Sequence, residues 1–117
     1  MLYETGYQGN FNPAQAVTIA ISTTTSPAVD CGGFVLCGIQ LPAVLTGTAI
    51  SFLASADGVT YQPLFNTTTG TLLSYTVTEA TFQAINPQDF QGVNYFKIVS
   101  NETEVAARTF HCALRGF

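Results

Sequence analysis

The 117-residue sequence predicts an all-β fold, an antiparallel β-sandwich, on the strength of three observations. Apolar and polar residues alternate along several short stretches, and this period of two places one side of a strand against a core. Turn residues interrupt these stretches about every 8–12 residues, as in sandwiches and barrels. Threonine occurs 17 times, and its β-branched side chain suits a pleated sheet.

Eight strands are predicted, and two of them precede residue 42. In each, every second residue is apolar. Proline cannot donate a hydrogen bond within a sheet, so the second strand is expected to stop at Pro42. The residues expected to share one face are Val17, Ile19 and Ile21 in the first strand, and Val35, Cys37, Ile39 and Leu41 in the second.

The third and fourth predicted strands, residues 50–54 and 61–65, flank the pair Asp57-Gly58. Tight turns between strands need residues that tolerate a positive φ, and Asp and Gly do so. A carboxylate that works as an acid or base needs a partner, and no other acidic residue is spaced to pair with Asp57. Asp57 is therefore predicted to be a turn residue.

Four further strands are predicted in the second half of the chain, at 73–77, 82–85, 93–100 and 108–117. A loop, NPQDFQG, separates the middle two. Eight strands in two packed sheets are most economically arranged as a jelly roll. The residues expected to face inward include Leu73, Tyr75, Val77, Phe96, Ile98, Phe110, Cys112 and Leu114.

Residues 16–117 are predicted to form this one domain, preceded by an extended N-terminal arm over residues 1–15. The arm carries Tyr3, Tyr7 and Phe11 at intervals of four, but its glycines and Pro13 disfavour a helix. These aromatic residues need a surface, in the same chain or on a neighbour, unless the terminus is frayed. We expect the docked arm.

The charge composition narrows the choice of partners. Only 9% of residues are charged, against about 25% in an average globular protein. Three basic residues and a net charge of −4 argue against binding to nucleic acid or to an anionic membrane. Interface cores are depleted in charge, so we expect part of the surface to be covered in an assembly.

Candidate catalytic and metal-binding residues are few. His111 is the single histidine, and strand geometry points it away from its neighbour Cys112. The spacing of Cys31 and Cys37 is not that of a zinc site. We expect no enzyme activity, no metal and no cofactor. Cys37 and Cys112 are expected in the core, and Cys31 in an exposed loop.

Two of the three cations lie in the last predicted strand. Arg108 and Arg115 are seven residues apart and should therefore point to opposite faces. Each is either an ordinary solvated or paired residue, or a specific partner for a carboxylate on a neighbouring subunit. The second alternative makes both of them candidate interface residues, together with Tyr3, Tyr7 and Phe11.

A family resemblance adds to this interpretation. A Leu-Pro-Ala segment leads into an apolar strand, followed by a Ser-Ala-Asp-Gly turn, a Gly-Val-x-Tyr-x-Lys strand and a final strand, RTFHCALRGF. Over residues 34–117 this order resembles small jelly-roll structural proteins of tailed bacteriophages. No catalytic residues are carried over from that group.

The resemblance implies a virion protein of the capsid decoration or cement type, on the outer surface of the head. Its expected partners are the major capsid protein of the same virus and further copies of itself, as a homotrimer. It would be made in the host bacterial cytoplasm. The alternatives are a tail- or neck-associated component, or a carbohydrate-binding adhesion module that uses Tyr61, Gln62 and Tyr95. A hydrolase that depends on His111 is a more distant alternative.

Overall fold

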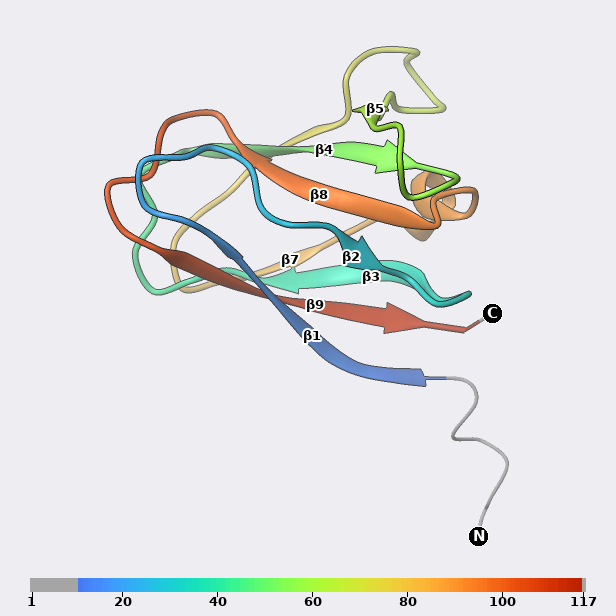
Figure 1. The fold of residues 1–117 in the computed structure, drawn as a ribbon, viewed down its shortest axis with the longest axis horizontal. Coiled ribbons are helices and arrows are strands. Elements are labelled where there is room, and N and C mark those ends of the chain that lie inside the picture. The colour runs from blue at the N-terminus through green and yellow to red at the C-terminus, as the bar shows by residue number, and fades with distance from the viewer. Residues whose placement is uncertain (1–10, 117) are drawn as a thin grey trace, which may run out of the picture.

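The computed structural model describes residues 11–116, with side chains described from residue 15 onward. Two antiparallel sheets face each other (Figure 1). One sheet has the order β1 (Phe11–Ile19), β9 (Arg108–Arg115), β3 (Val35–Gln40), β7 (Phe82–Ala84). The other has the order β2 (Val29–Asp30), β8 (Tyr95–Ser100), β4 (Ala49–Ser55), β5 (Gln62–Pro63), and β6 (Ser74–Thr76) also pairs with β4.

The strand order is that of a jelly roll. If the two-residue strand β5 is set aside, β1-β9-β3-β7 lies opposite β2-β8-β4-β6. Each connection between consecutive strands then crosses from one sheet to the other, except the one between β4 and β6, which pair within one sheet. The predicted antiparallel β-sandwich is confirmed. The predicted loop between the strands at 82–85 and 93–100 contains a single 3-10 turn, η2 (Pro87–Phe90). None of the helices in the described part of the chain is long and apolar enough to cross a membrane.

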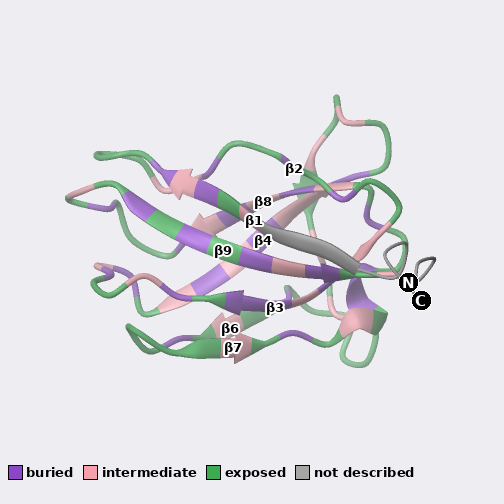
Figure 2. Cartoon of the chain, turned by 90° about the horizontal axis from the view of Figure 1, so that it is seen from below, coloured by how far each residue is buried: buried purple, intermediate pink, exposed green. Residues whose placement is uncertain are grey.

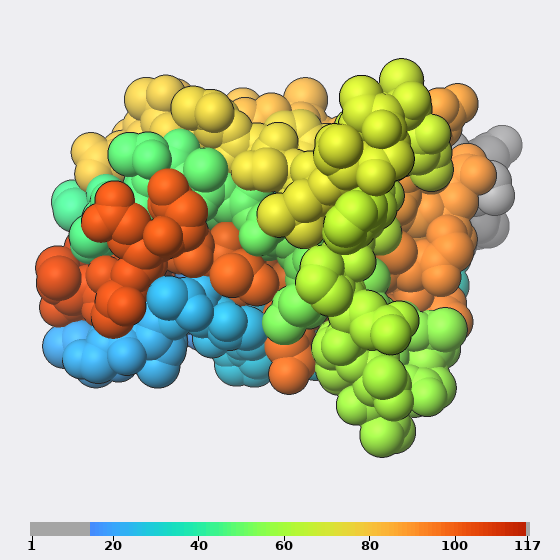
Figure 3. Space-filling model, turned by 90° about the horizontal axis from the view of Figure 1, so that it is seen from above, coloured from blue at the N-terminus to red at the C-terminus, as the bar shows by residue number. Residues whose placement is uncertain are grey.

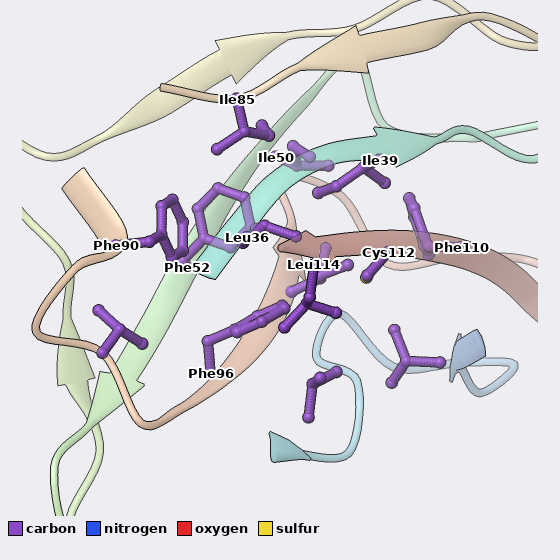
Figure 4. Packing of buried hydrophobic residues seen from close by; sticks show 14 of the residues in the cluster. Leu36, Ile39, Ile50, Phe52, Ile85, Phe90, Phe96, Phe110, Cys112 and Leu114 are labelled. Carbon is purple, nitrogen blue, oxygen red and sulfur yellow. The ribbon is translucent and has the colours of Figure 1, made fainter. Parts of the chain in front are cut away.

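Period-two alternation builds the core between the sheets. Buried and exposed residues alternate along β9 (Figure 2), and Phe110, Cys112 and Leu114 point inward as predicted. The ring of Phe52 lies at the centre of an aromatic group (Figure 4). Its centroid is 5.0 Å from that of Phe90 and 6.0 Å from that of Phe96, both edge to face. This geometry is the favourable one for aromatic rings.

The face predicted for β3 is wrong at its beginning. Leu36 is fully buried, whereas Cys37 is only half-buried. The pairing with β9 shifts by one residue between Leu36 and Gly38, which is the signature of a β-bulge. The extra residue reverses the alternation, so Leu36 and Ile39 both point into the core.

The boundaries of the first strand also differ from the prediction. Strand β1 begins at Phe11, so residues 11–15 are part of the sheet rather than of an arm. Pro13 is accommodated because β1 is an edge strand with a bulge between Asn12 and Gln15. At the other end the strand stops at Ile19, and Ile21 lies in a turn, 60% exposed, instead of in the core.

Replacing Phe52 with alanine tests the aromatic centre of the core. We expect Phe52→Ala to lower the free energy of unfolding by about 3–5 kcal/mol, because the ring is buried against three others and would leave a cavity. Phe82→Ala is the matched control, since Phe82 is 62% exposed and should cost only about 0.5 kcal/mol. Urea unfolding measures both, and equal losses would contradict this description of the core.

Candidate functional site

A buried carboxylate organises one end of the sandwich. Glu104 is fully buried and accepts four hydrogen bonds. The backbone N–H groups of Thr46 and Gly47 donate at 2.9 and 3.0 Å. The Ser100 hydroxyl and Arg108 Nε each donate at 2.8 Å. A side chain at position 47 would collide with the Ser100 hydroxyl, so glycine is required at this close approach.

These donors keep Glu104 ionised. Burial by itself raises the pKa of a carboxyl group, because a charge is costly away from water. Here the hydrogen bonds from Thr46, Arg108, Gly47 and Ser100 outweigh burial and lower the pKa of Glu104 to about 2. The site therefore holds a compensated ion pair, with Arg108 as the cation.

Three loops meet at this carboxylate: residues 20–28, 41–48 and 101–107. The backbone of Glu104 bonds to the first loop, through Ser22 N at 2.8 Å and Thr23 O at 3.0 Å. Asn101 accepts from the N–H groups of Thr48 and Ala49 and so ties the second loop to the third. The loops gather at one end of the long axis, on the left in Figures 1 and 3.

Apolar side chains project from these tied loops. Ile21, Val44 and Val105 come from one loop each and are 56–70% exposed. We call these three residues the loop-end surface. Beside it, an open hollow of about 550 Å³ is lined by Gln40, Leu41, Ala43, Ala80, Thr81 and the exposed ring of Phe82. Exposed apolar residues on rigid loops are typical of an interaction surface.

The candidate interface residues predicted from the sequence lie in different environments. Arg108 is buried and paired with Glu104 of its own chain, so its carboxylate partner is not on a neighbour. Arg115 is exposed at the end of β9, and the opposite faces expected for the two arginines are confirmed. The backbone of Phe11 pairs with Arg115 in the sheet, whereas Tyr3 and Tyr7 lie outside the described residues.

Two of the three cysteines, Cys31 and Cys112, are buried thiols. Cys112 is buried as predicted, but the exposed position expected for Cys31 is wrong: it is 1% exposed. The backbone of Cys31 bonds to Asn94 and Phe34, which directs its side chain into the core. Burial raises the pKa of Cys31 to about 11 and that of Cys112 to about 12, so neither is a reactive thiolate at neutral pH.

Asp57 is a turn residue, as predicted. Its Oδ1 accepts hydrogen bonds from the N–H groups of Val59 and Thr60 and from the Ser55 hydroxyl, and Gly58 has a φ of +79°. These bonds, led by the one from Thr60, lower the pKa of Asp57. His111 is exposed on β9, on the face opposite to Cys112. Among residues 11–116, no three His, Cys, Asp or Glu side chains are grouped to hold a metal ion.

The aromatic platform considered for carbohydrate is partly covered. Lys97 Nζ lies 4.4 Å from the centroid of the Tyr61 ring, a cation–π contact. The ring of Tyr95 packs against the turn at Gly58, and Gln62 is exposed. Neither ring is therefore fully open to a sugar.

Neither Glu104 nor the loop-end surface is marked by a pattern in the sequence. Glu104 lies in a loop, 58 residues from Thr46, so no local pattern marks their contact. One signal was present: Glu104 and Arg108 are four residues apart in a chain with only three cations. That spacing suggested an ion pair but not its burial.

Comparison with known proteins supports the fold. No protein-family model and no curated protein sequence matches the chain. The SPBc2 prophage-derived protein YomS is structurally similar, with a TM-score of 0.55 and 13% identity over 90% of this chain and 96% of YomS. CBM32-1 from a family 31 glycoside hydrolase of Clostridium perfringens has a TM-score of 0.53 and 21% identity over 84% and 75% of the two chains. At these identities the similarity establishes the fold alone.

Replacing Glu104 with glutamine tests the buried pair. We expect Glu104→Gln to lower the free energy of unfolding at pH 7 by roughly 3 kcal/mol, because it leaves the Arg108 guanidinium buried without its counter-charge. The folded pKa lies below that of an unfolded glutamate, about 4.3, so this stabilisation is present above pH 4.3 and is lost as the pH falls toward 2.

The difference between wild type and variant should therefore narrow over this pH interval, as measured by urea unfolding at a series of pH values. Glu102→Gln is the matched control: Glu102 is exposed two residues away, and its replacement should leave stability unchanged. A wild-type–variant difference that stays constant from pH 7 to pH 2 would contradict the role of Glu104.

Proposed function

We propose that this chain is a structural protein of a tailed-phage virion, a capsid decoration or cement protein that binds the outside of the head. The observation that carries the proposal is the loop-end surface. Its three apolar side chains come from loops that are tied together at Glu104, one through the carboxylate and one through the backbone of that residue. Anchors ordered before binding lose little entropy on association.

Two other lines support a phage role. Residues 34–117 resemble jelly-roll structural proteins of tailed phages, and a similar fold occurs in YomS, whose description is that of a prophage-derived protein. Glu104, whose pKa is lowered to about 2, is engaged by hydrogen bonds from its own chain. The proposal is therefore a binding role, not a catalytic one.

In this proposal the chain acts as a homotrimer at junctions between major capsid subunits. Three copies of the loop-end surface would contact several capsid subunits at once, and the weak contacts would add by avidity. We assign contact between copies to the outer face of β1-β9-β3-β7, where the exposed ring of Phe82 lies over Gly38 and the small residues Ala16 and Ala84 are also exposed. The protein would be made in the host bacterial cytoplasm and end on the outer capsid surface.

A tail- or neck-associated position is the alternative location, with the loop-end surface bound to a different virion protein. An adhesion module is the other alternative. The observation that favours carbohydrate binding is a hollow at the opposite end of the sandwich, lined by Gln62, Gln88 and Asp89 as well as by apolar residues.

A charge placed in the loop-end surface should weaken capsid binding. We expect Val105→Asp to weaken binding at least tenfold, because a desolvated carboxylate replaces an apolar anchor. Val59→Asp is the matched control, since Val59 is 81% exposed in the turn at the other end of β4. Cosedimentation with capsids of the encoding phage, with density mapping of the pellet, measures both variants. Equal binding of the two would rule out the loop-end surface as the contact.

The N-terminal residues provide a separate test. Because β1 begins at Phe11, removal of residues 1–10 leaves the sheet pairing intact. If Tyr3 and Tyr7 anchor the chain to a neighbour, the truncated protein should show lower occupancy on capsids while its urea unfolding midpoint is unchanged. Unchanged occupancy would remove the docked arm from the proposal.

A further inference from the structure

A second hollow lies at the end of the sandwich opposite to the loop-end surface. Its volume is about 390 Å³, within the usual range for small-molecule sites. It is formed where the end of β4 and strand β5 approach η2 and the turn after it, toward the right in Figure 3. The lining residues are Ala54, Ser55, Ala56, Gln62, Pro63, Leu64, Thr67, Gln88, Asp89, Gly92 and Val93.

Asp89 is the charged member of this lining, and it is only 8% exposed. Its Oδ1 accepts hydrogen bonds from Thr67, at 3.3 Å from the backbone N–H and 3.1 Å from the hydroxyl. Its Oδ2 accepts none from any residue in the described part of the chain. A buried carboxylate oxygen without a donor is costly, so Oδ2 is suited to accept a hydrogen bond from a ligand.

The remaining lining indicates the class of that ligand. The side-chain amides of Gln62 and Gln88 can both donate and accept, while Pro63, Leu64 and Val93 supply an apolar wall. A single carboxylate provides too few charged oxygens for a calcium ion, which takes six to eight oxygen ligands. A sugar ring matches this combination of polar and apolar lining residues, since it carries hydroxyl groups on its rim and C–H groups on its faces.

We infer that this hollow binds one sugar residue of a glycan, with Asp89 Oδ2 as the acceptor for its hydroxyl groups. The amides of Gln62 and Gln88 flank the ring and set its orientation. The inference goes beyond the proposed function. Because the hollow and the loop-end surface are at opposite ends of β4, a chain bound to a capsid through its loops keeps the hollow open to glycans.

The test is an amide chemical-shift titration of the full chain with methyl glycosides of galactose, glucose and N-acetylglucosamine, each added separately. The expected result is saturable shifts for at least one sugar, centred on Gln62, Thr67, Gln88 and Gly92. No saturable shift with any of the three would overturn the inference, as would saturation with calcium chloride alone at the same residues.

Two variants make the assignment to the hollow specific. Asp89→Asn retains an acceptor for Thr67 but replaces Oδ2 with a donor, so binding should weaken at least tenfold. Gly92→Leu fills the hollow: a Cβ at this position meets no atom within 4 Å, and its backbone is not left-handed, so the fold should tolerate it. Glu102→Gln, an exposed carboxylate at the other end, is the control and should bind as wild type does.

Sugar shifts that persist unchanged in both Asp89→Asn and Gly92→Leu would place any binding elsewhere and overturn the inference. Both variants should still cosediment with capsids as wild type does, because neither touches the loop-end surface. The proposed glycan site can therefore be contradicted without contradicting the proposed capsid contact, and the reverse also holds.

Discussion

The buried carboxylate of Glu104 is the constraint on which one end of this sandwich depends. A charge without water must be compensated by nearby donors, and here two backbone N–H groups, a hydroxyl and a guanidinium converge on it. All four groups lie outside the loop over residues 101–107 that carries Glu104. The conformation of the loops over residues 20–28, 41–48 and 101–107 is therefore coupled, and their exposed apolar side chains are presented together.

The jelly-roll topology explains how such a centre arises. Most connections cross between the sheets, so loops distant in sequence gather at the two ends of the sandwich. At one end, exposed apolar side chains lie on loops that are tied at the buried Glu104 carboxylate. At the other end, the amides of Gln62 and Gln88 and the carboxylate of Asp89 line a hollow. The two proposals, a capsid contact and a glycan site, follow from this separation of chemistry between the ends.

The predictions from the sequence agree with the structure for most of the strands, but not for the loops at the two ends of the sandwich. Alternation identified the inward residues of β4, β6, β8 and β9, and the Asp57-Gly58 turn has the hydrogen bonds expected of it. Alternation failed in β3, because a bulge adds one residue there. The exposed position predicted for Cys31 came from the neighbouring Gly32-Gly33 and was also wrong, because bonds of the Cys31 backbone to Asn94 and Phe34 direct the side chain into the core.

The sequence by itself determined the β-sandwich class, most of the strands and the turn at Asp57-Gly58. These features depend on residues at every second position or on a few consecutive residues. The tertiary structure alone decided the burial of Glu104, the loop-end surface and the hollow at Asp89. Each is made by residues far apart in the chain, as Thr67 and Asp89 are at a separation of 22. Such contacts exist only once two sheets have packed and their loops have met, and no local pattern records them.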